Sequence, residues 1–314
     1  MSTILITGGT GFLGKRLGKY FREAGNTVFL TGRNHDQNRA AESYSGCPVI
    51  PSDVANIESV RDVFAETSAD IVVHAAASKY VDTAEANPME CLDVNIAGSQ
   101  NVARVAVERK VSTVVGVSTD KAAPPVANTY GLTKAVMERL YCAMDAKAAT
   151  RFVCVRFGNM PWSTGSAIPI WQRMIEESGE IQSTGSHMTR LFTPVDEAVK
   201  LIQTAVDRID EVRGKVLCRT MKAARIEDFL RVWTERKGGT WRKIAPRAGE
   251  RDYEHLIGES ELEYTRQIHL DGVVHYLIEP NILQAQPLDV LVSSVNAERL
   301  SDDEIWEIIK EAPE

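Results

Sequence analysis

The chain has 314 residues, of which 44% are hydrophobic and 25% are charged. This composition is ordinary for a globular protein and excludes a disordered, collagen-like or disulfide-scaffold chain. Because a domain usually has roughly 100–200 residues, the length favours one large domain with a smaller appendage. The formal net charge of −7 provides no general basic field, so we expect neither nucleic acid nor a membrane surface as a partner.

The N-terminus, MSTILITGG, lacks the basic segment of a secretion signal, and no apolar run approaches the roughly 20 residues that span a bilayer. These features predict a cytoplasmic protein. The five cysteines are scattered and form no C-x-x-C pair, so the sequence predicts no metal site.

Short apolar segments alternate with amphipathic segments through the first half of the chain. Expected strands lie at residues 3–7, 26–31, from 49, 71–74, 111–117 and 151–156, and expected helices at 15–24, 93–109 and 130–148. The strands have hardly any polar face, which is typical of a parallel sheet covered by helices on both sides. The sequence therefore predicts an α/β fold with a Rossmann-type, doubly wound parallel sheet.

Beyond residue 160 this alternation loosens. Gly, Ser, Thr and Pro cluster in 160–169 and 179–189, which indicates loops and short elements. We predict a cofactor-binding core at residues 1–160, to which about 191–220 return, and a smaller C-terminal substrate-binding lobe at 161–190 and 221–285. Residues 286–314 are predicted to form a helical extension, because Ser301 and the acidic residues after it precede an apolar helical pattern.

The first expected strand leads directly into a glycine-rich turn. Its glycines, Gly8, Gly11 and Gly14, have the spacing G-x-x-G-x-x-G, and Thr10, Phe12 and Leu13 lie between them. The first glycine permits a tight turn, the second lets the backbone approach a pyrophosphate, and the third lets the helix pack on the strand. The N-terminus of the helix then faces the phosphates. The motif therefore predicts a dinucleotide site.

The end of the second expected strand bears on the choice of cofactor. It reads Thr31-Gly32-Arg33, where NAD sites commonly carry an acidic residue. An arginine can pair with a 2′-phosphate, so the sequence favours NADP over NAD. A solvated loop charge is the alternative for Arg33. Asp53 is expected to accept a hydrogen bond from the adenine amino group, although a simple turn residue would look the same.

Tyr130 and Lys134 stand four residues apart on one face of an expected helix. A phenol ordinarily titrates near 10, but a neighbouring ammonium group and an oxidised nicotinamide both favour the phenolate and make it a usable base. Such pairs are common on solvated helices. Here the pair follows the fifth expected strand in a chain that also carries the glycine turn, and this context predicts a catalytic pair.

Further motifs accompany these two. They lie at residues 7–14, 74–79, 95–99, 118–122, 130–134, 156–159, 188–190 and 247–250. With these segments the chain resembles the extended short-chain dehydrogenase/reductase superfamily and, within it, the UDP-N-acetylglucosamine 4,6-dehydratases of polysaccharide biosynthesis. Thr-Asp-Lys-Ala and Met-Thr-Arg are the motifs most specific to this branch.

The resemblance implies roles for individual residues. Tyr130 would take the C4 hydroxyl proton as hydride leaves C4, with Thr119 bonded to the same oxygen and Lys134 holding the ribose. Lys121 would then remove the C5 proton while Asp120 protonates the departing C6 hydroxyl, and hydride would return to C6. An ordinary solvated loop pair is the alternative for Asp120 and Lys121.

The resemblance also implies binding residues. It adds Val54, Ala75, Ala76, Ala77 and Asn95 to the cofactor site, and it assigns Lys79, Asn159, Ser166, Arg190, Arg247 and Glu250 to a UDP-sugar. His74 is expected to serve packing at the strand end. A homo-oligomer is expected, because family members usually assemble through helices that flank the sheet.

Two departures from the family pattern concern the substrate. The segment 122–129 is one residue longer than usual, and Met160-Pro161-Trp162-Ser163-Thr164 replaces a stretch of small aliphatic residues, glycine, serine and arginine. Trp162 would stack on the sugar or base, or fill an interface between lobes. The competing functions are a nucleotide-sugar epimerase or 4-ketoreductase, which would not need Asp120 and Lys121 as acid and base, and a redox-sensing binding protein.

Overall fold

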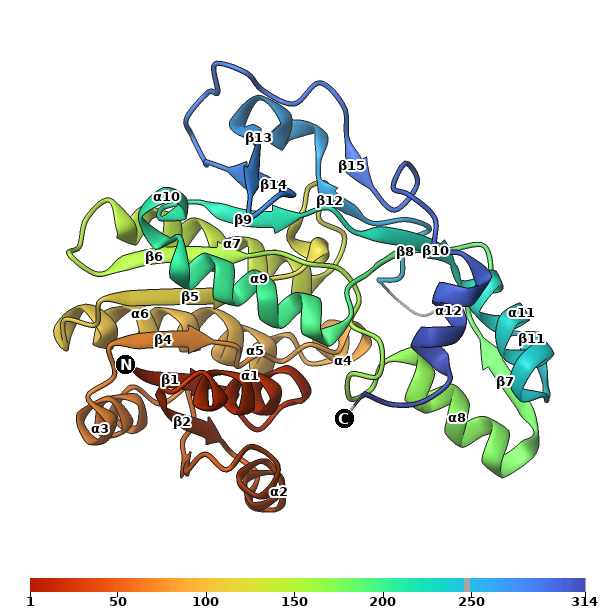
Figure 1. The fold of residues 1–314 in the computed structure, drawn as a ribbon, viewed down its shortest axis with the longest axis horizontal. Helices are drawn as coiled ribbons and strands as arrows, with labels where there is room; N and C mark the ends of the chain where they lie inside the picture. The colour runs from red at the N-terminus through yellow and green to blue at the C-terminus, as the bar shows by residue number, and fades with distance from the viewer. Residues whose placement is uncertain (246–248, 314) are drawn as a thin grey trace.

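A nine-stranded sheet forms the centre of the molecule (Figure 1). The computed structural model describes residues 1–245 and 249–313, and the strand order is β13-β14-β9-β6-β5-β4-β1-β2-β3. Seven strands run parallel to one another: β1 (Thr3–Thr7), β2 (Thr27–Gly32), β3 (Val49–Pro51), β4 (Ile71–His74), β5 (Thr113–Val117), β6 (Arg151–Val155) and β9 (Val216–Arg219). At one edge, β14 (Val273–Ile278) and β13 (Thr265–Leu270) continue the sheet in antiparallel register.

Both faces of the sheet are covered by helices. Successive residues of β1 show this, because Leu5 belongs to one buried apolar cluster while Ile4 and Ile6 belong to another. One cluster packs under α3 (Ile57–Thr67), α6 (Gly98–Glu108) and α7 (Thr129–Asp145), and the other under α1 (Phe12–Glu23), α2 (His35–Ser45), α9 (Val195–Asp207) and α10 (Ile209–Val212). The predicted Rossmann-type fold is thus confirmed, and its strands are apolar because neither face meets water.

A short helical stretch connects β4 to α6. It consists of α4 (Val81–Ala86), α5 (Pro88–Leu92) and the π-helical turn η1 (Asp93–Ala97). The helix expected at 93–109 therefore begins with a π-helical turn.

A smaller lobe follows β6, beside the carboxyl ends of the strands (Figure 1). Its helices are α8 (Ala167–Ser178), α11 (Ile226–Lys237) and α12 (Asp302–Ile309). Its strands pair two by two as β7 (Glu180–Ser183) with β11 (Thr240–Lys243), β8 (Thr189–Phe192) with β10 (Lys222–Arg225), and β12 (His255–Ile257) with β15 (Val292–Ser293). Buried Trp171 and Trp233 lie edge to face in its separate core, with ring centroids 6.3 Å apart.

The structure differs from the predicted domain limits in two places. Residues 265–278, assigned above to the lobe, form β13 and β14 and extend the central sheet, because β14 pairs with β9. They follow the short 3-10 helix η3 (Glu259–Tyr264). In the predicted helical extension, the described residues form one helix, α12; the preceding stretch is largely irregular and contains Pro287, which has no N–H to donate within a helix.

Among the residues that the structure describes, no helix combines the length and apolar character needed to cross a membrane.

Candidate active site

A cleft of about 640 Å³ opens at the carboxyl ends of the central strands. The glycine turn forms its floor, and Gly8 there has φ +66°. A Cβ at Gly8 would lie 2.6 Å from backbone atoms of Ala76, so only glycine fits. Helix α1 starts after Gly11 without a side-chain cap or an acidic residue in its first turn. Its N-terminal N–H groups can therefore bind a diphosphate, and the cleft fits a dinucleotide.

The predicted residues of the turn all line this cleft: Gly8, Thr10, Gly11, Phe12, Leu13 and Gly14. Val54 and Ala75, Ala76 and Ala77 line it as well. Asn95 lies behind the wall: its buried amide accepts from the Ser78 backbone N–H at 2.8 Å and donates to Thr133 Oγ1 at 2.9 Å. Asn95 therefore ties the segment after β4 to α7, a supporting position that the sequence pattern did not predict.

Arg33 lines the cleft at the end of β2, and its side chain is 55% exposed. Its guanidinium lies 3.7 Å from the Asp53 carboxylate and 3.8 Å from that of Glu90. The Asp53 carboxylate also accepts from the backbone N–H of Ala55 at 3.0 Å. Arg33 thus faces the cleft, whereas Asp53 closes its own turn and pairs with Arg33.

His74 is fully buried at the end of β4. Its Nδ1 lies 2.7 Å from Thr7 Oγ1 and its Nε2 lies 3.1 Å from Ser99 Oγ. Burial, together with the nearby Lys134, lowers the pKa of His74 to about 3. The neutral ring joins β1, β4 and α6, which is the packing role expected of it.

Helix α7 carries Tyr130 and Lys134 along the cleft. Asn128 caps this helix by accepting from the Gly131 N–H at 2.8 Å. Lys134 Nζ donates to the Val117 carbonyl oxygen at 2.8 Å, and burial lowers the pKa of Lys134 to about 8. Burial and then the Asp120 charge raise the pKa of Tyr130, against a hydrogen bond with Thr119. The phenol is therefore protonated at neutral pH in this structure.

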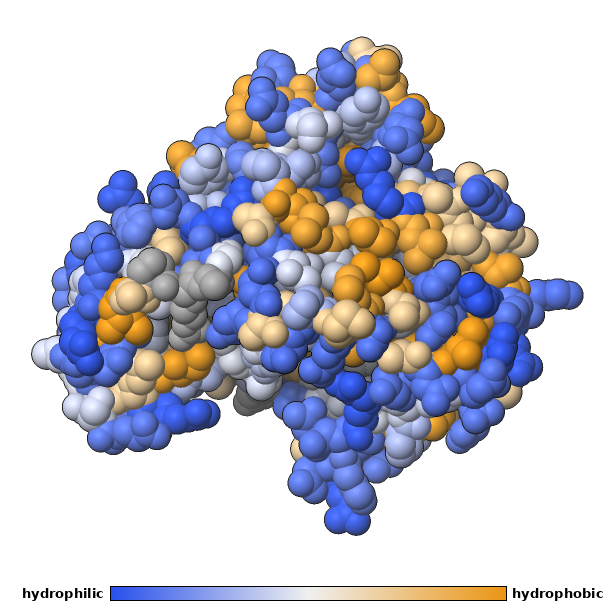
Figure 2. Space-filling model, turned by 180° about the vertical axis from the view of Figure 1, so that it is seen from behind, coloured by the Kyte–Doolittle hydropathy of each residue, from blue (hydrophilic) through white to orange (hydrophobic). Residues whose placement is uncertain are grey.

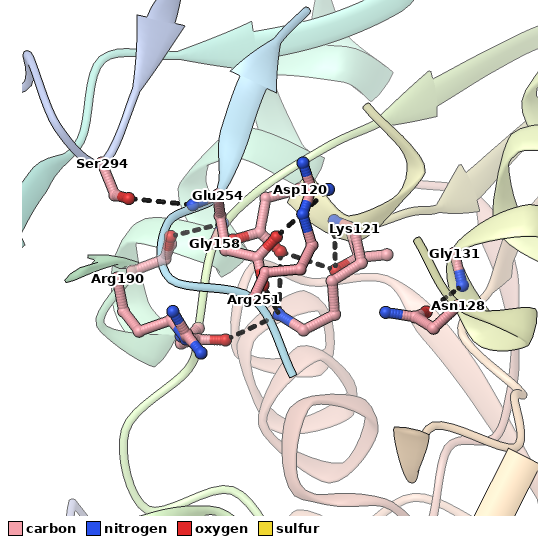
Figure 3. Close-up of polar contacts among 12 residues, drawn as sticks. Asp120, Lys121, Asn128, Gly131, Gly158, Arg190, Arg251, Glu254 and Ser294 are labelled. Carbon is pink, nitrogen blue, oxygen red and sulfur yellow. Dashed lines mark hydrogen bonds and ion pairs between the residues drawn. The ribbon is translucent and has the colours of Figure 1, made fainter. Parts of the chain in front are cut away.

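The 3-10 helix η2 (Asp120–Ala122) follows β5 and presents the predicted acid/base pair (Figure 3). Lys121 Nζ donates to Asp120 Oδ1 at 3.1 Å and to Asn159 Oδ1 at 3.0 Å. Thr119 Oγ1 donates to the same Asp120 oxygen at 3.0 Å. Thr119 and Lys121 line the cleft, whereas the Asp120 side chain is fully buried behind them. Lys121 is therefore the member of the pair that reaches the reaction space.

The predicted substrate residues lie around the cleft and a second cavity of about 280 Å³ that shares Asn159 and Ser166 with it. Lys79 lines the cleft, and Arg190 and Glu250 line the second cavity. Arg247 lies outside the described residues. Burial lowers the pKa of Lys79. The two cavities therefore meet at Asn159, whose Oδ1 accepts from Lys121 Nζ.

The two departures from the family pattern leave the predicted catalytic residues together. Trp162 belongs to neither cavity lining; its Nε1 donates to the Ile308 carbonyl oxygen at 2.6 Å, so it fills the interface with α12. Thr164 does line the cleft. Despite the longer segment 122–129, Lys121 and Tyr130 line the same cleft.

Sequence reasoning missed Glu254 and Arg251, which precede β12. The Glu254 side chain is 3% exposed, and its Oε1 lies 3.8 Å from Lys121 Nζ. Arg251 Nη1 lies 3.7 Å from the other Glu254 oxygen. No motif marks these residues, because long-range contacts place their segment: β12 pairs with β15, and the Thr189 N–H donates to the Asp252 carbonyl oxygen at 2.8 Å.

Comparisons with known proteins agree with this geometry. Residues 4–273 match the model of the family described as "Polysaccharide biosynthesis protein". A Campylobacter jejuni UDP-N-acetylglucosamine 4,6-dehydratase (inverting) is 32% identical, covering 89% of this chain and 83% of its own length. A Rickettsia typhi UDP-glucose 4-epimerase is also 32% identical, covering 83% and 79%.

The X-ray structure of Pen from Bacillus thuringiensis superposes with a TM-score of 0.89 at 27% identity, covering 98% of this chain and 97% of that one. Fold, cleft and relatives thus agree. The chain belongs to the polysaccharide biosynthesis protein family of nucleotide-sugar dehydratases and epimerases.

Proposed function

We propose that this protein is a nucleotide-sugar 4,6-dehydratase that converts UDP-N-acetylglucosamine, or a related UDP-hexosamine, to the 4-keto-6-deoxy sugar. The observation that carries the proposal is that two acid/base groups, Tyr130 and the Lys121–Asp120 pair, flank one dinucleotide-shaped cleft. Tyr130 would exchange a proton with the C4 hydroxyl, and the Lys121–Asp120 pair would exchange protons at C5 and at the C6 hydroxyl. An epimerase would need only the first.

Tyr130 accepts the proton of the C4 hydroxyl, and Thr119 hydrogen-bonds the same oxygen. A nicotinamide cofactor held along the glycine turn would supply hydride transfer between C4 and C6, and its positive charge in the oxidised form would favour the phenolate. Lys134, buried one helical turn beyond Tyr130, holds the ribose. These residues serve oxidation at C4.

The C4 ketone acidifies the C5 proton, which the Lys121 amine removes. As the C5–C6 double bond forms, the C6–O bond breaks and the hydroxyl leaves as water with a proton from the Lys121–Asp120 pair. Because Asp120 is buried behind Lys121, that proton reaches the sugar through Lys121 Nζ. This revises the direct contact of Asp120 with the C6 hydroxyl that the resemblance implies.

We propose NADP as the cofactor because Arg33 lines the cleft. A guanidinium can bind a 2′-phosphate through two hydrogen bonds. The carboxylates of Asp53 and Glu90, 3.7 and 3.8 Å from Arg33, would have to turn aside for this contact. NAD is therefore the competing cofactor.

Proton NMR of the purified protein with UDP-N-acetylglucosamine and a catalytic amount of NADP⁺ tests the proposal. We expect a new C6 methyl doublet, with deuterium at C5 when the reaction runs in D₂O. An inverted C4 without a methyl signal would establish the epimerase. A 4-ketoreductase would instead oxidise C4 only until the NADP⁺ is reduced, with one reduced cofactor formed for each ketone, and bound cofactor without turnover would favour a redox sensor.

A further inference from the structure

The acid/base pair beside the cleft is part of a larger buried cluster (Figure 3). Lys121 Nζ is surrounded by oxygens of Asp120, Asn159 and Glu254, at 3.1, 3.0 and 3.8 Å. The side chains of Asp120 and Glu254 are 0% and 3% exposed. Two buried carboxyl groups thus flank the Lys121 amino group, and Glu254 has no part in the roles assigned so far.

The backbone of Glu254 is held on both sides. Its N–H donates to Ser294 Oγ at 2.9 Å, and its carbonyl oxygen accepts from the Ser294 N–H at 2.8 Å. Among the described residues, Glu254 Oε2 and Asp120 Oδ2 have no hydrogen-bond partner. A buried carboxylate oxygen without a donor is costly when charged and less so when it carries a proton.

The proposed reaction requires a second proton beside Lys121. Departure of the C6 hydroxyl as water consumes one proton, and reprotonation of C5 after hydride reaches C6 consumes another. Removal of the C5 proton supplies only one of these two. The C4 hydroxyl supplies the other proton, which Tyr130 holds on a different element and releases to solvent, whereas a carboxyl group next to Lys121 can deliver a proton to it directly.

We propose that Glu254 is a positioning residue that holds Lys121 between its own carboxyl group and that of Asp120 and stores the proton that Lys121 delivers to C5. This inference rests on the proposed dehydratase function. In each turnover the Glu254 carboxyl gives its proton to the Lys121 amine, the resulting ammonium gives one to C5, and solvent reprotonates the carboxylate. Glu254 lines neither cavity and so acts through Lys121.

The charges around Glu254 agree with this role. Lys121 and Asp120 face it from η2, Arg190 from β8 and Arg251 from its own segment. The three cations act to lower the pKa of Glu254, whereas burial, the largest influence, and Asp120 raise it, and the raising influences prevail. The carboxyl therefore retains its proton to a higher pH than an ordinary glutamate.

The decisive experiment compares Glu254→Gln with the full-length wild type, using UDP-N-acetylglucosamine and the NMR assay for the methyl product. We expect kcat to fall by about 10- to 100-fold, as for a displaced catalytic group, while KM stays within about threefold. In the wild type, kcat should fall as the pH rises through the titration of Glu254. In E254Q this inflection should be absent, because an amide stores no proton.

Two further variants complete the test. Glu259→Gln makes the same change at an exposed position nearby and should match the wild type. Glu254→Asp keeps the carboxyl and should retain the inflection with an intermediate kcat, and it replaces E254Q if that variant fails to fold. A wild type without the inflection, or an E254Q that matches E259Q, overturns the inference and leaves the dehydratase standing. A wild type that forms no methyl product overturns the proposed function itself.

Discussion

Trp162 and Ile308 connect the segment after β6 to the C-terminal helix. The indole Nε1 of Trp162 donates to the Ile308 carbonyl oxygen at 2.6 Å, and Trp162 has φ +64°. Its ring packs with the core of the small lobe. Met160 and Ser163, in the same segment, line the cleft. The Trp162 side chain thus connects the segment that lines the cleft to the C-terminal helix α12.

Trp162→Phe should weaken this anchor while keeping most of the packing. The loss of one hydrogen bond, with a carbonyl left without this donor, costs about 1 kcal/mol. Thermal unfolding should show a lower Tm, and KM for the nucleotide sugar should rise because Ser163 belongs to the same segment. Trp306→Phe, in the same core, is the matched control: it should lower Tm without raising KM. A W162F enzyme with wild-type Tm and KM would show that the contact contributes neither stability nor positioning.

Tyr130→Phe should greatly reduce turnover and leave cofactor binding intact. The variant removes one hydroxyl from the cleft without disturbing the cap of α7, which depends on Asn128 and Gly131. Loss of general acid/base catalysis typically lowers kcat by about 10²- to 10⁴-fold. The NMR assay measures kcat, and fluorescence titration measures NADP(H) binding. Wild-type turnover in Y130F would remove Tyr130 from the mechanism.

The sequence motifs located the parts of the site that depend on local structure. The glycine turn, Tyr130 and Lys134 were predictable because each lies within one strand, turn or helix whose period is visible in the sequence. Glu254 was not, because it reaches Lys121 through a pairing of two short strands without a motif. Asn95 was predicted to contact the cofactor, but its amide instead bonds Ser78 and Thr133 behind the wall of the cleft. Its position near the cleft was predictable from the sequence, whereas its hydrogen-bond partners were not.

The same distinction applies to the fold. Strands β1 to β6 were predictable from their apolar runs, because a strand that is buried on both faces shows little alternation of apolar and polar residues. Strands β13 and β14 were assigned to the small lobe, since nothing local shows that β14 pairs with β9. Long-range antiparallel pairing at a sheet edge depends on contacts that local periodicity does not encode.

Arg33→Ala tests the cofactor proposal. If the guanidinium binds the 2′-phosphate, the variant should lose NADP affinity by about tenfold or more, corresponding to a charge-assisted pair worth 1.5–3 kcal/mol, and keep its NAD affinity. Isothermal titration calorimetry with each cofactor measures the ratio of the NADP and NAD affinities. Arg39→Ala, on α2, is a control that should leave it unchanged. Equal losses for NADP and NAD would favour a general phosphate contact or NAD as the natural cofactor.

The buried His74 predicts a pH dependence of stability. Its pKa is lowered from 6.5 to about 3 in the folded protein, so the unfolded chain binds more protons between these values. The stability that depends on the neutral ring is fully present above pH 6.5 and is lost as the pH falls towards 3. Urea unfolding at several pH values should show a declining free energy of unfolding, and His74→Gln should show a shallower decline. Parallel curves would contradict this assignment.

An exposed apolar surface on α5 and α7 supports the expected homo-oligomer. Met89 and Leu92 on α5 are 71% and 38% exposed, and Leu132 and Val136 on α7 are 54% and 45% exposed. Figure 2 shows hydrophobic residues gathered on the face opposite to the view of Figure 1. Helices that meet a second copy commonly carry such a surface.

Val136→Glu should therefore shift the protein to a smaller species, because a charge on this surface opposes its burial. Light scattering after size exclusion measures the mass. Val295→Glu, at a residue that is 54% exposed in the small lobe, should leave the mass unchanged. If V136E and V295E both keep the wild-type mass, and that mass is a monomer's, the apolar surface has another purpose. If both keep the mass of an oligomer, the contact between copies lies elsewhere.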